Sequence, residues 1–358
     1  MASEQWREIV KLAFLGTLLA FAAVLIDVQV RGNGNVVSLL QPGEQGPSVA
    51  VFHQDFPELQ LPNGIGHDGQ QFYAIARQPM HLSAVAPQLD RPQYRLQRPL
   101  LPWLAWLLHP QGGGTGLVDA LFAVEILAFF AGGIAMGYLS LSLGGPAWLA
   151  TIFPVLPGCL ASGRIIGADA LATALVLAAL ALALRNRWVA AVAVAVAAVL
   201  AKEPVVLVLI GFALWRRDRR AVALAAVPLA VAGAWAAYLR VAVDATGGQV
   251  QEFTPPFGGL WDSLDAWMHG HEVFAFAVVV GALALGTYEL VRHGLRSPLG
   301  WALALELTFT VFMSRDVLGL NFNGTRTTLP LQALVLLALF TPRDAIVNPR
   351  RAAPAATR

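Results

Sequence analysis

The chain has 358 residues, of which 57% are hydrophobic and only 13% are charged, and its formal net charge at pH 7 is +2. Soluble domains carry about 25% charged residues, so this composition excludes an ordinary soluble protein and indicates an integral membrane protein. A single cysteine, Cys159, excludes an internal disulfide framework. The sequence has no zinc-ligand spacing, phosphate-binding glycine loop or nucleotide fingerprint.

Apolar runs long enough to cross a bilayer as helices recur along the chain. They cover residues 12–28, 118–143, 146–162, 169–185, 221–243, 273–292 and 298–313, with a shorter run at 328–341. The apolar segment 188–215 is interrupted by the letters AKEP and has arginines at both ends. The positive-inside rule puts both arginine clusters on one side, so this segment is predicted to be a hairpin that turns near Pro204.

These segments predict an all-α polytopic membrane protein with about ten transmembrane or near-spanning helices. The arginine distribution predicts a multi-pass protein with both termini in the cytoplasm. Residues 1–343 are expected to form one integral membrane domain. The polar tail 344–358 is expected to be disordered.

Two outer loops are predicted, at residues 29–116 and 244–272. The first is long enough to fold and contains the apolar stretch LLPWLAWLL. This stretch is too short to cross a bilayer, so we expect it to lie along the membrane surface with Trp103 and Trp106 in the headgroup layer.

Charged residues at the ends of the spans gather mostly on the predicted outer side, which indicates a polar cavity that opens outward. In the first outer loop, the letters DGQQ resemble a capping box with Asp68 at the helix N-cap and Gln71 reaching back. The same carboxylate is a candidate to accept a proton from a substrate hydroxyl, and the two interpretations are compatible.

Three further residues leave two interpretations open. Lys202 and Glu203 either solvate the tip of a short hairpin or supply a phosphate ligand through the lysine ammonium. Asp169 is either a helix N-cap or part of the polar cavity.

Several stretches together resemble bacterial members of the GT-C glycosyltransferase superfamily. They are GHDGQQFYAIARQP, LDRPQYRLQRPLLPWLAWLL, ADALATALVLAALAL, AKEPVVLV and TRTTLPLQALVLLAL, which occur in that order over most of the chain. The chain is most similar to proteins of cell-surface glycopolymer formation, whose first outer loop carries a YDGQFYY and a YRYQR segment. His67 stands where those proteins have tyrosine, and Gln71 interrupts the usual aromatic run.

The resemblance implies a GT-C-like fold and an inverting transfer of a sugar from a polyprenyl-phosphate donor. The acceptor would be a glycan, lipid or protein on the outer side of the bacterial cytoplasmic membrane, facing the periplasm or cell exterior. By motif match Asp68 is the expected general base, with Asp27 as the second candidate. The expected ligands of the donor phosphate are Arg98, Arg164, Lys202 and Arg326. The expected cavity residues are His67, Gln71, Tyr73, Arg77, Tyr94, Arg95, Asp169 and Glu203.

The expected partners are therefore the lipid-linked donor, the acceptor and the lipid bilayer, with no nucleic acid. Outer-loop carboxylates leave a divalent metal open, although no DxD pair occurs in the outer loops. Two rival interpretations remain. A transporter or flippase of lipid-linked sugar would also have converging charges but predicts paired polar residues at the bilayer midplane. A non-catalytic scaffold of the same fold would bind substrate without turnover.

Overall fold

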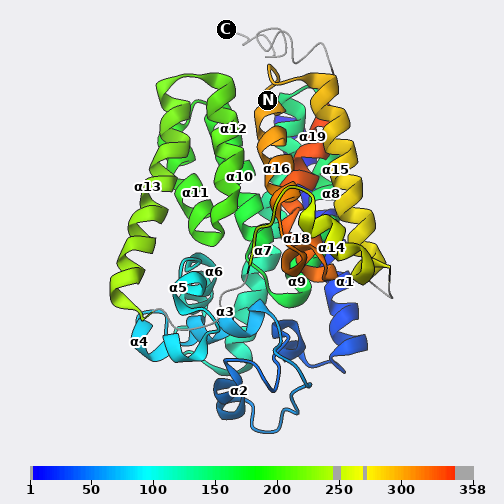
Figure 1. The fold of residues 1–358 in the computed structure, drawn as a ribbon. Coiled ribbons are helices and arrows are strands. Elements are labelled where there is room, and N and C mark those ends of the chain that lie inside the picture. Colours follow the sequence, from blue (N-terminus) through cyan, green and yellow to red (C-terminus); the bar gives the residue numbers. More distant parts are fainter. Residues whose placement is uncertain (1–2, 245–250, 269–271, 343–358) are drawn as a thin grey trace.

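The computed structural model describes residues 3–244, 251–268 and 272–342, and within them the chain is helical apart from one isolated bridge between Phe253 and Met313. Figure 1 shows long helices running side by side and smaller helices gathered at one end. The all-α expectation is confirmed for this part of the chain. The predicted tail 344–358 lies outside the described residues.

Four described helices are long and apolar enough to cross a membrane. They are α1 (Ser3–Arg31), α7 (Gly114–Ser142), α13 (Arg219–Ala242) and α15 (Val273–His293). At 21 to 29 residues each reaches the thickness of a bilayer core, which is about 30 Å. These helices support a bilayer environment, and each contains most of a run that the sequence predicts to span.

Shorter apolar helices pack beside the long ones. They are α10 (Asp169–Leu184), α11 (Trp188–Ala201), α12 (Val206–Arg216), α16 (Gly300–Phe312) and α19 (Leu329–Leu339). Each is shorter than the roughly 20 residues that a full crossing takes. The predicted segments are therefore helical, but their lengths alone do not establish ten crossings.

The prediction of one continuous span over 146–162 is wrong. The chain forms α8 (Leu149–Val155) and α9 (Pro157–Ile165) instead, separated by Leu156, whose ψ of 142° is not helical. Proline disfavours helical geometry in the residue before it, and Pro157 therefore ends α8 and begins α9. The break allows α9 to pack against α18 (Asn321–Thr327), which carries Arg326.

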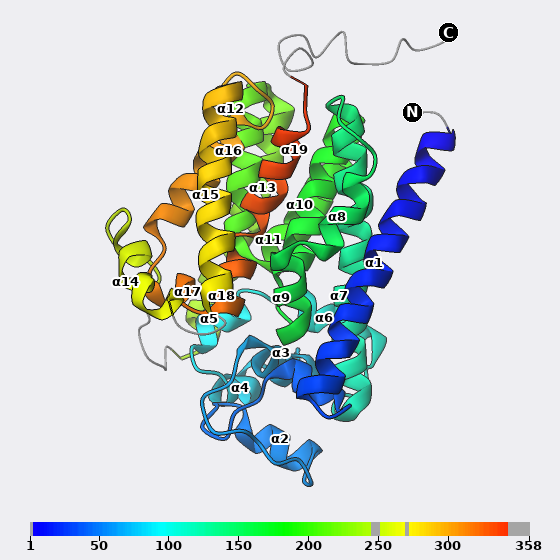
Figure 2. The ribbon, with the colours of Figure 1, turned by 90° about the vertical axis from the view of Figure 1, so that its right-hand side faces the viewer.

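The predicted hairpin in 188–215 is present. α11 ends at Ala201, Lys202 is extended, and the short 3-10 helix η3 (Glu203–Val205) leads into α12. The turn points toward the end of the molecule that carries the smaller helices (Figure 1). The start of α1 and the end of α19 lie at the opposite end (Figure 2).

The first predicted outer loop is largely helical and covers one end of the bundle (Figure 2). It contains η1 (Val36–Leu40), α2 (Val49–Asp55), α3 (Asp68–Arg77), α4 (Leu82–Val85), η2 (Ala86–Gln88), α5 (Pro92–Leu96) and α6 (Leu100–Leu108). α6 packs against α3 and α7, and the Trp103 ring meets Trp235 of α13 edge-on at 5.7 Å. Its last residues, Leu107 and Leu108, are exposed.

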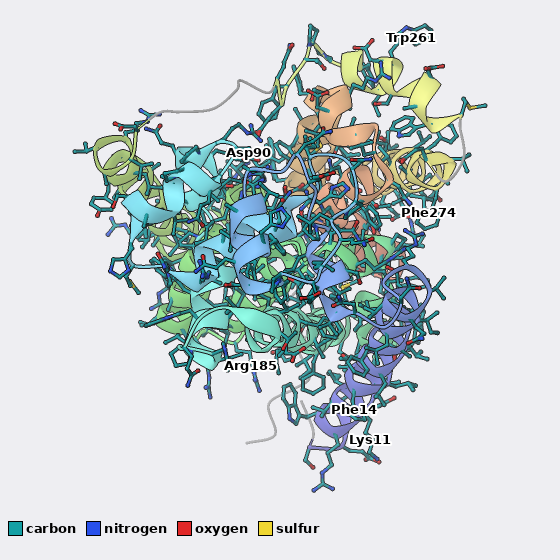
Figure 3. All side chains as sticks on the ribbon, turned by 90° about the horizontal axis from the view of Figure 1, so that it is seen from below. Lys11, Phe14, Asp90, Arg185, Trp261 and Phe274 are labelled. Carbon is teal, nitrogen blue, oxygen red and sulfur yellow. The ribbon has the colours of Figure 1, made fainter. Side chains whose placement is uncertain are left out.

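The second predicted outer loop contributes α14 (Gly258–Trp267), which packs against α15 and the short α17 (Arg315–Leu318). Trp267 is buried and its indole donates a hydrogen bond to the carbonyl of Leu318. Trp261 on the opposite face of α14 points away from the molecule at its edge (Figure 3).

Candidate active site

A cavity of about 1070 Å³ lies where the first-loop helices meet the bundle. Its walls come from α3, α5, the start of α10, the α11–α12 turn, α16 and α18. Figure 3 looks onto this end of the molecule, where Asp90 is labelled. The predicted site residues that line the cavity are His67, Asp68, Gln71, Tyr94, Arg95, Arg98, Asp169, Lys202 and Arg326. The structure thus brings together residues from distant parts of the sequence.

Asp68 is held between two arginines. One carboxylate oxygen accepts a hydrogen bond from Arg95 Nη1 at 2.6 Å and the other from Arg326 Nη2 at 2.5 Å. Burial alone would raise the pKa of Asp68, but the nearby guanidinium groups of Arg326 and Arg95 outweigh it and hold the pKa well below its ordinary value. Asp68 is therefore an ionised carboxylate when the cavity holds no substrate.

The predicted capping box at DGQQ is not formed. The N-cap of α3 is His67, and Asp68 is the first helical residue with its carboxylate turned to the arginines. Gln71 instead accepts a hydrogen bond from the backbone amide of Asp90 at 3.1 Å, which ties α3 to the segment before α5. Burial and Arg326 lower the pKa of His67, so its ring is neutral near pH 7.

Glycines explain how the start of α3 reaches this position. Gly66 has a φ of +68°, a conformation that favours glycine. A Cβ on Gly69 would lie 2.4 Å from the carbonyl oxygen of Ile165 and 2.9 Å from the Cα of Leu40. Because only glycine allows this approach, α3 packs directly on α9 and η1 and places Asp68 at the cavity wall.

Asp169 connects Lys202 to Arg326, the arginine that also binds Asp68. One of its oxygens accepts a hydrogen bond from Arg326 Nη1 at 3.1 Å, and the other pairs with Lys202 Nζ. All three residues are buried, with Lys202 only 8% exposed. The interpretation of Lys202 as a solvated hairpin tip is therefore wrong, and Asp169 makes no capping bond because the N-cap of α10 is Ala168.

Tyr94 organises the arginines of the LDRPQYRLQR segment. Its ring lies beneath the guanidinium groups of Arg91 and Arg98, at 4.0 and 4.3 Å from the ring centroid. Arg98 also donates to the Tyr94 hydroxyl at 2.7 Å and to Glu203 at 3.0 Å. Glu203 thus lies next to the cavity through Arg98, although it is not among the lining residues.

The charges of this cluster balance. The cations are Arg95, Arg98, Lys202 and Arg326, and their ion-pair partners are Asp68, Asp90, Asp169 and Glu203. Asp90 binds Arg95 through both of its oxygens, at 2.8 and 2.7 Å. Guanidinium groups can exchange a carboxylate for a phosphate because both present paired oxygens. The acids therefore hold the cations in place, and a bound anion could replace the acids as the partner of those cations.

The remaining predicted residues lie outside the cavity lining. Asp27 pairs with Arg164 at 2.6 Å and with Arg31 at 3.1 Å. Tyr73 donates a hydrogen bond to Asp55 at 2.6 Å, and Arg77 pairs with the same carboxylate at 2.9 Å. The Asp27 pairs join α1 to α9 and stay within α1, and the Asp55 contacts connect the first loop to itself, so these residues support the fold around the cavity.

Asn323 and Glu252 are among the cavity residues that the structure adds to the predicted ones. Asn323 accepts a hydrogen bond from Arg326 at 3.0 Å and so helps to orient it. Glu252 pairs with Arg91 at 2.9 Å and connects the two predicted outer loops. The signal for Asn323 was its place one helical turn before Arg326, whereas Glu252 has no local signal.

No group of three or more histidine, cysteine, aspartate or glutamate side chains that could hold a metal ion is found in the described part of the chain. Asp68 and Asp169 are both engaged by cationic side chains. These residues therefore do not form a site that fits a divalent metal.

Comparison with known proteins returns no match to a protein-family model, to a curated protein or to a solved structure. The resemblance of the loop segments to the GT-C superfamily therefore stays an expectation from sequence. The geometry of the cavity is the physical basis for assigning a function.

Proposed function

We propose that the protein is a GT-C-type glycosyltransferase that moves a sugar from a polyprenyl-phosphate carrier to a glycan, lipid or protein acceptor. The reaction would take place at the outer face of the bacterial cytoplasmic membrane. Two observations support it. They are the loop segments that resemble this superfamily and the cavity that these segments line at one end of the bundle.

The observation that carries the proposal is that a first-loop carboxylate, Asp68, lies in this cavity within a cluster that contains four cations and their paired acids. Asp68 lies beside Arg326, and Arg95, Arg98 and Lys202 line the same wall. A glycosyl phosphate needs cationic groups at the phosphate, where negative charge develops as the bond breaks. It also needs a base within hydrogen-bond reach of the acceptor hydroxyl. This cluster offers both.

The proposed reaction is a single displacement. The acceptor hydroxyl gives its proton to Asp68 while its oxygen bonds to the anomeric carbon. The bond from that carbon to the phosphate oxygen breaks, and its electron pair leaves with the phosphate, which the cationic side chains stabilise. One displacement inverts the configuration of the anomeric carbon.

Substrate binding would also activate the base. Arg326 divides its guanidinium between Asp68 and Asp169. A donor phosphate that draws Arg326 toward itself weakens the contact with Asp68, and loss of a nearby positive charge raises the pKa of a carboxyl. Asp68 would then be a stronger base with donor bound than without it.

The proposal includes a topology. Residues 1–343 form one membrane domain with about ten crossings, both termini are cytoplasmic, and the cavity faces the periplasm. No short helix is long enough to cross alone, so in this topology each crosses together with the segments that connect it to its neighbours. The arginine clusters at the ends of α10, α12 and α15 support this orientation.

Binding of polyprenyl phosphate to the purified protein in nanodiscs tests the proposal. Arg326→Lys keeps the charge but loses the forked hydrogen bonds, so we expect affinity to fall about tenfold. Arg164→Lys is the matched control, because Arg164 pairs with Asp27 outside the cavity. Absence of binding by the wild-type protein, or a loss confined to Arg164→Lys, would contradict the proposal.

A non-catalytic scaffold is the second candidate function. The low pKa of Asp68 and the full pairing of its carboxylate favour it, because both make Asp68 a weak base in the substrate-free protein. A scaffold would bind the lipid phosphate with the same arginines and produce no transfer. Turnover therefore distinguishes the two functions.

A further inference from the structure

Besides the Nε atoms of Arg91 and Arg326, whose guanidinium groups are bound through other nitrogens, two polar side-chain atoms on the cavity wall have no hydrogen-bond partner in the described part of the chain. They are Oε1 of Glu306, on α16, and Oγ1 of Thr173, on α10. Each residue is only 1% exposed. The proposed transfer uses neither of them.

Glu306 differs from the acids of the charged cluster. Asp68, Asp90 and Asp169 each bind cationic side chains, whereas no ion pair or side-chain hydrogen bond is made by Glu306 within the described residues. A buried polar atom without a partner destabilises the folded protein. A ligand in the cavity can supply the missing partner.

We infer that Glu306 and Thr173 form a hydroxyl-binding subsite that holds the sugar of the lipid-linked donor. The inference rests on the proposed function and adds how the sugar is recognised. A carboxyl and a hydroxyl together accept and donate hydrogen bonds, as sugar hydroxyls require. Phe309 and Val205 line the same cavity and offer apolar surface to the C–H faces of a sugar ring.

The position of Thr173 fits a sugar that is bonded directly to phosphate. Thr173 lies one helical turn beyond Asp169, a rise of about 6 Å along α10. Asp169 itself holds Arg326 and Lys202, the proposed ligands of the phosphate. A phosphate held by these cations therefore has its sugar within reach of Thr173.

The test compares two lipid probes in nanodiscs, bare polyprenyl phosphate and the same carrier bearing glucose, mannose or galactose. We expect the wild-type protein to bind at least one sugar lipid more tightly than the bare lipid. Glu306→Leu should lower affinity for that sugar lipid about tenfold and leave the bare lipid unchanged. Glu306→Gln, which keeps hydrogen-bonding groups, should retain more of the preference, and Thr173→Val should lose part of it.

Glu125→Gln is the matched control. Glu125 is also buried with one unpartnered carboxyl oxygen, but it does not line the cavity. Its substitution should leave the preference for the sugar lipid intact. Thermal unfolding checks that the variants fold, and Glu306→Leu should melt no lower than wild type because it removes an unpartnered buried group.

The outcomes separate this inference from the proposed function. Failure of the wild-type protein to bind either lipid overturns both. Binding of the bare lipid with no preference for any sugar lipid overturns the subsite alone. A preference that survives Glu306→Leu and Thr173→Val also overturns it, as does an equal loss for both lipids.

Discussion

Asp68 and its two arginines fix the pH behaviour of the site. A carboxyl whose pKa is lower in the folded than in the unfolded protein adds stability above its unfolded pKa and loses it as pH falls through the folded pKa. The pKa of Asp68 lies well below 3.8 in the folded protein. Its contribution is therefore complete at pH 5 to 7 and is lost only in stronger acid.

We expect the melting temperature of Asp68→Asn to lie below that of wild type at pH 7. The gap should narrow below about pH 4, because Asp68 of the unfolded wild-type chain is then protonated while that of the folded protein is still ionised. Thermal unfolding in detergent across this pH range measures both. Arg164→Gln, a change outside the cavity, serves as a control for general effects of a lost charge. A gap that closes already between pH 7 and 5 would contradict the lowered pKa.

Lys202 supplies a second test at the residue scale. Its ammonium pairs with Asp169 in a buried position. Lys202→Met therefore leaves one oxygen of the Asp169 carboxylate without its cationic partner. Breaking a buried pair on one side costs about 3 kcal/mol or more in the free energy of unfolding. Denaturant unfolding measures the cost, and a variant as stable as wild type would contradict it.

The close packing of α3 is testable at the scale of the element. Gly69→Ala puts a methyl group 2.4 Å from the Ile165 carbonyl oxygen, so α3 must move. We expect a loss of about 1–3 kcal/mol in unfolding free energy and weaker binding of polyprenyl phosphate. Gly281→Ala in α15, where a Cβ meets nothing within 4 Å, is the control, and it should be neutral or stabilising. Equal effects of the two substitutions would contradict this account of how Asp68 is positioned.

The helix breaks show what sequence can and cannot predict at this scale. The α11–α12 turn was predictable because Pro204 and arginines at both ends of the segment independently indicate a hairpin. The α8–α9 break was missed although Pro157 lies in the run, because apolarity alone cannot distinguish one helix from two. The contact between Asp68 and Arg326 joins residues 258 positions apart. Motifs suggested both residues, but no spacing rule predicts that they touch.

Topology is the prediction for the whole molecule. Cys159 is the one cysteine of the sequence and is buried, so introduced cysteines can be labelled separately. A membrane-impermeant maleimide should label Glu58→Cys, in the first loop, in intact cells. It should label Asn186→Cys, after α10, only once the membrane is permeabilised. The reverse pattern would place the cavity in the cytoplasm and contradict the orientation.

At the same scale the molecule is a helical bundle with the helices of the first loop gathered at one end (Figures 1 and 2). The polar cavity lies where those helices meet the bundle. Composition predicted the bundle, and the loop segments pointed to six of the residues that line the cavity, from His67 to Arg98. The balanced ion pairs were not predictable because they depend on how α10, α18 and the α11–α12 turn meet.

The most direct measurement is surface glycopolymer in a deletion strain complemented with wild type, Asp68→Asn or Asp90→Asn at equal membrane abundance. Both variants remove a carboxylate that pairs with Arg95, but only Asp68 is proposed as the base. A lost general base lowers the rate by about 100-fold or more. We therefore predict glycan loss with Asp68→Asn and its retention with Asp90→Asn. Full restoration of the glycan by Asp68→Asn would contradict the proposed catalytic role of Asp68.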